Sequence, residues 1–181
     1  KDDEIEKLKL KDAIQMHRDT KIAIENYVAD NNLNQVKPTI LVSCKDTTHA
    51  KSIFDYVTSD EFYDGEFKEK ALQIDSTSKT DEQVEQLLTL EKPDNSIEIV
   101  IHVDMLKEGW DVSNLYTIVP LRAANALTLI EQTIGRGLRL PFGGKRTGVE
   151  KVDMLSIMMH EKFQEVVDAA KDKNSILYSI G

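Results

Sequence analysis

The sequence predicts an α/β fold: a parallel sheet flanked by helices, with an extra helix at the N-terminus. Short apolar runs alternate with segments in which apolar residues recur every three or four positions, and this alternation is typical of strands joined by crossover helices. Several runs are apolar almost throughout, as in parallel strands buried on both faces. With 181 residues, 40% of them hydrophobic, the chain is long enough for one domain with a substantial core.

Residues 1–36 are expected to form a helical segment that packs on the rest of the chain. One long helix is predicted over residues 2 to about 32, because apolar residues recur there at helical spacing. The stripe comprises Leu10, Ile14, Ile24 and Val28, with His17 and Lys21 in the same register. Asparagines at 31, 32 and 34 end the helix, and a second unit, residues 37–181, follows.

The second unit is predicted to alternate strands with helices. Strands are predicted over residues 39–44, 71–75, 97–103, 115–121 and 152–159, and helices over residues 47–57, 81–90, 123–136 and 160–172. Asp46 is expected to cap the first of these helices, because its carboxylate can accept a backbone N–H. The helix over 81–90 is expected to turn Val84, Leu87 and Leu88 inward.

An arginine pair in QTIGRGLR (residues 132–139) is the strongest candidate for chemistry. Arg136 and Arg139 are three residues apart, so a helix would place both on one face. Their planar, permanently charged guanidinium groups suit a polyphosphate and the charge that develops when a γ-phosphoryl group is transferred. Most arginine pairs on helices are solvated surface residues. The pair therefore indicates a function only in combination with other motifs in the sequence.

A second motif, DMLKEGWDV (residues 104–112), follows the predicted strand 97–103. Gly109 lets the backbone approach a ligand closely, and the Asp111 carboxylate can accept a hydrogen bond from a ribose hydroxyl. An ordinary strand exit with a solvated aspartate is the alternative. Trp110 could stack on a base or anchor the packing of this loop.

Together the two motifs resemble motifs V and VI of superfamily 2 helicases, in the order and spacing of the second RecA-like lobe. Four segments are further similar to the restriction (Res) subunit of type III restriction-modification enzymes. They are KPTILVSCKD (37–46), MLKEGWDV (105–112), YTIVPLR (116–122) and EQTIGRGLRLPFG (131–143). The resemblance covers roughly residues 10 to 170, and it implies that residues 37–181 are a helicase C-terminal, RecA-like lobe.

The resemblance also implies roles. The parent protein would hydrolyse ATP, with Mg²⁺ held by a first RecA-like lobe of the same parent chain, and would move on double-stranded DNA. Arg136 and Arg139 would reach the triphosphate, and Gln132 would orient the site. The implied nucleotide-contacting residues are Gly109, Asp111 and Gly135. A methyltransferase (Mod) subunit is implied as a partner, and the nuclease would lie outside this sequence.

The exit of the first predicted strand is a candidate nucleic-acid contact. In helicases of this type the corresponding exit often touches the nucleic-acid backbone. Lys45, Thr47 and Thr48 lie where a helix N-terminus would offer free N–H groups to a phosphate. A simple helix cap is the alternative.

Two rival functions remain open. One is the lobe of a different superfamily 2 enzyme, such as a type I restriction motor or a repair helicase. The other is a non-catalytic RecA-like binding module, although such a module has little need for the pair Arg136 and Arg139.

Charge is distributed unevenly along the chain. The net charge is −9, but residues 60–98 account for −8 of it, whereas residues 132–151 carry +4. A local phosphate-binding surface is therefore compatible with a chain that is acidic overall.

Several kinds of site are not expected. The single cysteine, Cys44, permits no internal disulfide, suits the cytoplasm and is expected to be a buried, inert thiol. The histidines are scattered at 17, 49, 102 and 160, so no metal site is predicted. No apolar run approaches the ~18 residues that span a bilayer.

The chain is expected to fold without hydrolysing ATP. It contains neither the G-x-x-x-x-G-K-[ST] loop nor the D-E-x-H box that hold phosphates and magnesium, so we interpret it as a fragment of a longer helicase. The measurement is a phosphate-release assay with Mg²⁺-ATP. Clear magnesium-dependent turnover by the purified chain would refute the fragment interpretation.

Overall fold

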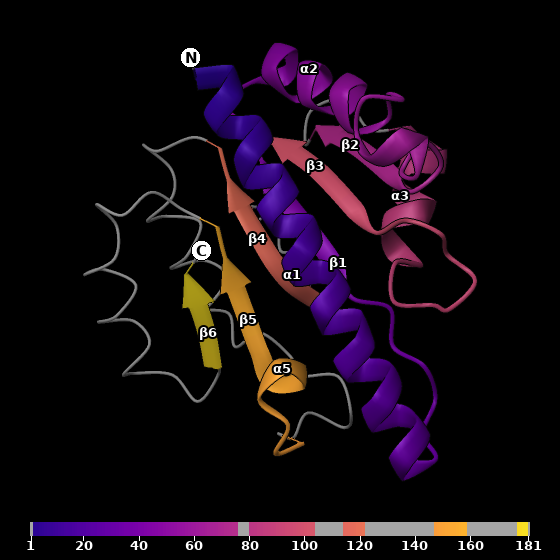
Figure 1. Ribbon diagram of the computed structural model, residues 1–181. Coiled ribbons are helices and arrows are strands. Elements are labelled where there is room, and N and C mark those ends of the chain that lie inside the picture. The colour runs from indigo at the N-terminus through magenta and orange to yellow at the C-terminus, as the bar shows by residue number, and fades with distance from the viewer. Residues whose placement is uncertain (1, 76–79, 104–113, 122–146, 159–176, 181) are drawn as a thin grey trace.

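The computed structural model describes residues 2–75, 80–103, 114–121, 147–158 and 177–180. Its centre is a six-stranded sheet with the order β2-β3-β1-β4-β5-β6 (Figure 1). The strands are β1 (Thr39–Ser43), β2 (Ala71–Asp75), β3 (Ile99–Val103), β4 (Leu115–Pro120), β5 (Met154–Ile157) and β6 (Leu177–Ile180). Every neighbouring pair is parallel. The predicted parallel α/β fold is confirmed.

Helices cover the sheet. They are α1 (Asp2–Asn31), α2 (Thr47–Val57), α3 (Asp81–Leu88) and α5 (Glu150–Asp153), with a short 3₁₀ helix, η1 (Tyr63–Gly65). The predicted N-terminal helix is confirmed: α1 crosses the sheet in front of β1 and β4 and also contacts α5 (Figure 1). The predicted helices at 123–136 and 160–172 lie outside the described residues.

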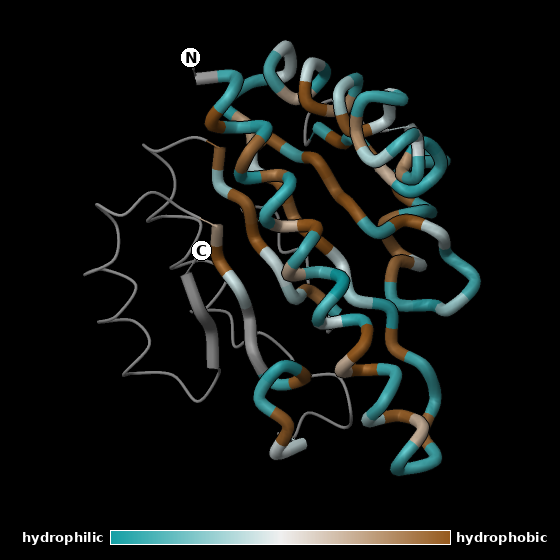
Figure 2. Tube along the Cα trace, viewed as in Figure 1, coloured by the Kyte–Doolittle hydropathy of each residue, from teal (hydrophilic) through white to brown (hydrophobic). Residues whose placement is uncertain are grey.

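The core lies between α1, α2 and the central strands. Apolar side chains of both helices and three strands form one buried cluster, which includes Leu10, Ile14, Ile53, Val57, Ile40, Val42, Ile99, Ile101 and Val119. All five residues of β1 are buried, as expected for a strand covered on both faces. Figure 2 shows hydrophobic residues along the central strands beneath α1.

A buried carboxylate fastens α1 to the sheet. Glu98, just before β3, accepts a hydrogen bond at Oε1 from His17 Nε2 at 2.6 Å and from Lys21 Nζ at 3.2 Å. Lys70 Nζ lies 3.5 Å from the other carboxylate oxygen. Burial by itself would raise the pKa of Glu98, but the hydrogen bond and charge of His17, followed by Lys21, outweigh it and lower that pKa to about 2.

The predicted inward face of α3 is wrong. Val84 and Leu88 are 37% and 75% exposed, and Leu87 is only half-buried. The reason is polar docking: the Gln83 side chain closes a capping box at the start of α3 and donates to the Gln73 carbonyl at 2.9 Å. With this polar side toward β2, the helix turns Val84 and Leu88 to solvent.

The C-terminal strands also differ from the prediction. β5 starts at Met154, two residues later than expected, because residues 150–153 form the turn α5. The Asp153 carboxylate stabilises the preceding turn by accepting the N–H groups of Thr147 and Gly148 at 2.8 and 3.0 Å. The edge strand β6 was not predicted. Among the helices described, none is long and apolar enough to cross a membrane.

Glu98→Gln should weaken the fold in a pH-dependent way. The folded-state pKa of about 2 lies below the ordinary glutamate value of 4.5, so the carboxylate stabilises the fold above pH 4.5 and loses this effect as the pH falls toward 2. The shift corresponds to on the order of 3 kcal/mol. The measurement is urea unfolding of wild type and variant at pH 7 and pH 3, where the difference should shrink.

Glu66→Gln is the matched control for Glu98→Gln. Glu66 also pairs with α1, through Arg18 at 2.6 Å, but both side chains are about 40% exposed. The loss should therefore stay below about 1 kcal/mol. Equal effects of the two variants at both pH values would refute the anchoring role of Glu98.

Candidate functional site at the carboxyl edge of the sheet

Three neighbouring strands end together at one edge of the sheet. β1 lies between β3 and β4, and the register places Ser43 beside His102 on one side and Pro120 on the other. The chain leaves β3 after Val103 and β4 after Pro120. Residues 104–112 and 132–139 therefore follow, in sequence, strands that flank the exit of β1. Ligands of parallel α/β sheets collect at such an edge.

Most of the predicted site residues lie outside the described residues. They are Gly109, Trp110, Asp111, Gln132, Gly135, Arg136 and Arg139. Their roles stay predictions. The strand ends from which their segments depart are described.

The turn from β1 into α2 carries the three predicted nucleic-acid residues. Asp46 caps α2 as predicted, because its Oδ1 accepts the His49 N–H at 2.8 Å. Lys45, Thr47 and Thr48 are all exposed. The cap is thus confirmed, whereas a phosphate contact at this turn stays a prediction.

The Thr47 hydroxyl already has an intramolecular role. It donates to Asp75 Oδ2 at 2.6 Å and so ties the turn to the end of β2. Asp46 and Asp75 also place two carboxylates at the N-terminus of α2, where negative charge competes with an incoming phosphate. Lys45 and Thr48 are therefore better candidates than Thr47 for a nucleic-acid contact.

Glu6 of α1 and His49 of α2 support this turn, and the sequence did not reveal them. The Lys45 N–H donates to His49 Nδ1 at 3.1 Å, and His49 Nε2 lies 2.9 Å from Glu6 Oε2. Glu6 is 43 residues from His49 along the chain. No local pattern signals so distant a pair.

Two titratable groups just beneath the edge are inert at neutral pH. Burial, assisted by the carboxylates of Glu6 and Asp46, raises the pKa of the Cys44 thiol to about 12. The predicted buried, unreactive cysteine is confirmed. Burial also lowers the pKa of His102 to about 3, so its ring is neutral and does not serve as a general acid.

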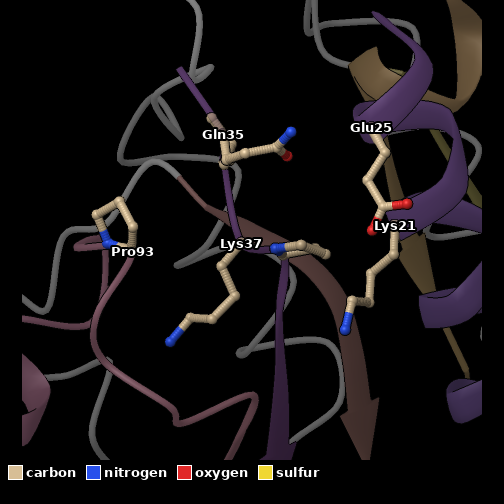
Figure 3. A pocket seen from close by; sticks show the side chains of 7 residues that line it. Lys21, Glu25, Gln35, Lys37 and Pro93 are labelled. Carbon is tan, nitrogen blue, oxygen red and sulfur yellow. The ribbon is translucent and has the colours of Figure 1, made fainter. Parts of the chain in front are cut away.

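A small cavity lies at the opposite, amino edge of the sheet. It has a volume of about 160 Å³ and is lined by Lys21, Glu25, Gln35, Val36, Lys37, Pro38 and Pro93. Figure 3 shows Lys21 and Glu25 reaching from α1 toward the segment that precedes β1. Lys37 Nζ donates to Asn95 O at 2.8 Å, and burial lowers the pKa of this amine to about 8. The cavity contains none of the predicted site residues.

Metal ligands do not gather in the described part of the chain. Within the described ranges, no three His, Cys, Asp or Glu side chains lie where they could hold a metal ion.

The chain matches a known protein family. The model of the helicase conserved C-terminal domain matches residues 20–141. The matched range includes β1 to β4 and both sequence motifs, at 104–112 and 132–139.

Two curated relatives are similar over shorter stretches. The probable type III restriction-modification enzyme HindVIP Res subunit of Haemophilus influenzae is 54% identical over 46 residues, which are 25% of this chain and 9% of that protein. The EcoP15I Res subunit of Escherichia coli is 34% identical over 71 residues, 37% of this chain and 7% of that protein. Each match thus spans less than a tenth of the relative.

Two solved structures are similar to this chain. Domain 2 of the DEAD-box helicase Mss116p, bound to an RNA duplex, has a TM-score of 0.48 at 14% identity, covering 93% of this chain and 60% of that one. The C-terminal part of the Fun30 ATPase domain has a TM-score of 0.43 at 14% identity. The match covers 79% of this chain and 40% of that chain.

Asp46→Ala should lower the free energy of unfolding by about 1 kcal/mol, because α2 loses its N-cap. Asp46→Asn should remain close to wild type, since asparagine caps equally well. Urea unfolding measures both. Asp55→Ala is the control: Asp55 is an exposed residue of α2 that pairs with Lys51 at 3.1 Å, worth about 0.5 kcal/mol at most. If Asp46→Asn lost as much as Asp46→Ala, the capping role would be wrong.

Proposed function

Because the chain belongs to the helicase conserved C-terminal domain family, we propose that it is the second RecA-like motor lobe of an ATP-dependent DNA translocase, of the kind found in type III restriction enzymes. The observation that carries the proposal is the strand order at the carboxyl edge. β3, β1 and β4 are neighbours. β3 leads directly into residues 104–112 and β1 into the turn before α2, and residues 132–139 are the next sequence motif after β4. The three strands that precede these segments therefore end at a common edge.

The nucleotide contacts are assigned to the segments after β3 and β4. The N-terminus of α2 carries Asp46 beside Asp75, and this charge pattern does not favour a triphosphate. Arg136 and Arg139 are better suited, because a guanidinium fork can bind phosphate oxygens in two places at once. Gln132 and Gly135 would shape the same segment, and Gly109 and Asp111 would approach the nucleotide from the neighbouring strand end.

ATP, bound with Mg²⁺ on a first lobe, would supply the free energy for movement. The second lobe contributes charge at the moment of phosphoryl transfer. Positively charged groups that meet the γ-phosphoryl group mainly in the transition state raise turnover with little effect on ground-state binding.

The nucleic-acid contact is assigned to the turn between β1 and α2. Lys45 and Thr48 are exposed there and could contact backbone phosphates, which position a protein on DNA without reading its sequence. A chain with a net charge of −9 and few basic contacts should bind DNA weakly and lose that binding as salt is raised.

The assignment to a type III restriction enzyme is favoured over the other candidates by the sequence of the four matching segments and by the curated relatives. Both curated relatives described above are Res subunits of type III enzymes. By that similarity a methyltransferase (Mod) subunit is the proposed partner of the parent protein, and its nuclease would lie elsewhere. A type I restriction motor or a repair helicase is the second candidate, because the matching family is described only as the helicase conserved C-terminal domain. A non-catalytic module remains the least favoured.

Arg139→Ala, made in the complete motor protein, should reduce ATP turnover roughly 10³- to 10⁵-fold and change nucleotide affinity little. Arg139→Lys should restore little activity, because a point charge does not reproduce the fork. Turnover and nucleotide affinity are measured side by side. Arg136→Ala is expected to lower both quantities.

Arg146→Ala is the matched control for Arg139→Ala, because Arg146 is a nearby arginine outside the motif. It should keep near-normal turnover. If Arg139→Ala behaved like Arg146→Ala, the proposed role of Arg139 in phosphoryl transfer would have to be abandoned.

A further inference from the structure

A chain of hydrogen bonds joins α1 to the backbone of the β1–α2 turn. Lys45 N–H donates to His49 Nδ1 at 3.1 Å, and the opposite ring nitrogen of His49 lies 2.9 Å from Glu6 Oε2. The side chains of His49 and Glu6 are 8% and 19% exposed. Figure 1 shows the N-terminus of α1 at the same end of the sheet as the strand arrowheads. The contact therefore lies at the carboxyl edge.

The contact fixes the state of the imidazole ring. Because Nδ1 accepts the Lys45 N–H, it carries no proton, so the ring proton is on Nε2 and is donated to Glu6. The hydrogen bond at one ring nitrogen thereby sets the tautomer and orientation of the other. Burial raises the pKa of the neighbouring Cys44 thiol, and the Glu6 carboxylate adds to this effect, as expected for a carboxylate held close to the end of β1.

The turn is held from both sides. On one side Glu6 orients His49, which holds the Lys45 N–H, and on the other Asp75 holds the Thr47 hydroxyl at 2.6 Å. A backbone N–H held in place restricts the φ angle of its own residue, and so the direction in which the Lys45 side chain leaves the sheet. Restricting a contact residue before binding lowers the entropy lost on binding.

We infer that Glu6 and His49 are positioning residues, which hold the β1–α2 turn so that Lys45 meets the phosphate backbone of DNA. The inference rests on the proposed nucleic-acid role of this turn and adds α1 to the binding machinery. Neither Glu6 nor His49 needs to touch DNA in this arrangement. Glu6 carries a negative charge, and charge alone would make it unfavourable for DNA binding.

Removing the Glu6 carboxylate separates positioning from simple electrostatics. If Glu6 acted only through its charge, Glu6→Ala would strengthen DNA binding. If it positions the turn, Glu6→Ala and His49→Ala should raise the Kd for a DNA duplex about 3- to 10-fold, equivalent to about 0.7 to 1.4 kcal/mol. Fluorescence anisotropy at low salt measures the Kd. Glu4→Ala is the matched control, because Glu4 is an exposed carboxylate on the same helix, and the Kd of this variant should equal that of wild type or fall below it.

A conservative variant tests the connection directly. In His49→Asn the amide oxygen can replace Nδ1 as the acceptor for Lys45 N–H, but the side chain is too short to reach Glu6. In ¹H–¹⁵N spectra the Lys45 amide should resist exchange with water in wild type and His49→Asn, and should lose that protection in His49→Ala. Long-range ¹⁵N spectra of the wild-type ring should show the Nε2–H tautomer. Thermal unfolding checks that every variant is folded.

The possible results are distinct. A Kd of Glu6→Ala that matches that of Glu4→Ala, or an unprotected Lys45 amide in wild type, overturns the positioning role. An unchanged Kd in Lys45→Ala overturns the DNA contact of the turn, and with it this inference, whatever the Kd of Glu6→Ala. Weaker binding in Lys45→Ala, Glu6→Ala and His49→Ala, together with retained protection in His49→Asn, supports the inference.

Discussion

The buried carboxylate of Glu98 is the interaction on which the placement of α1 depends. Taking a carboxylate out of water is costly unless it is paired and hydrogen-bonded, and Glu98 is satisfied by His17, Lys21 and Lys70. Two of these partners belong to α1. The carboxylate therefore holds the helix against the sheet and also fixes its position along the sheet. Apolar contacts of Leu10 and Ile14 add burial on the same face.

With its middle anchored near the start of β3, α1 reaches the other edge of the sheet. Glu6 precedes His17 by eleven residues, a distance of ~17 Å along a helix at 1.5 Å per residue. A five-residue strand has a similar length of ~17 Å. The first turns of α1 therefore arrive where the strands end, and Glu6 meets His49 there. One helix thus connects the two edges of the sheet.

Features set by local sequence could be predicted, and features set by distant partners could not. Periodicity identified α1, apolar runs identified five strands, and residue type identified the Asp46 cap. The role of Glu98 was not predicted, because its partner His17 is 81 residues away. The exposed Val84 and Leu88 were misjudged because polar contacts, and not the apolar stripe, dock α3. The four-residue strand β6 is too short for a periodic signal.

The same distinction holds for the candidate site. Lys45, Thr47 and Thr48 were predicted as site residues because they directly follow a strand. Glu6 and His49 could be recognised only from the three-dimensional structure, because they come from different helices.

The most direct test of the carboxyl edge as the functional edge is hydrogen–deuterium exchange of the complete motor protein with and without a DNA duplex. Peptides that cover residues 44–50 should exchange more slowly when DNA is bound. Peptides that cover residues 33–38, beside the cavity at the amino edge, should exchange at the same rate in both states. Protection of 33–38 with no change at 44–50 would contradict the assignment and move the nucleic-acid surface to the opposite edge of the sheet.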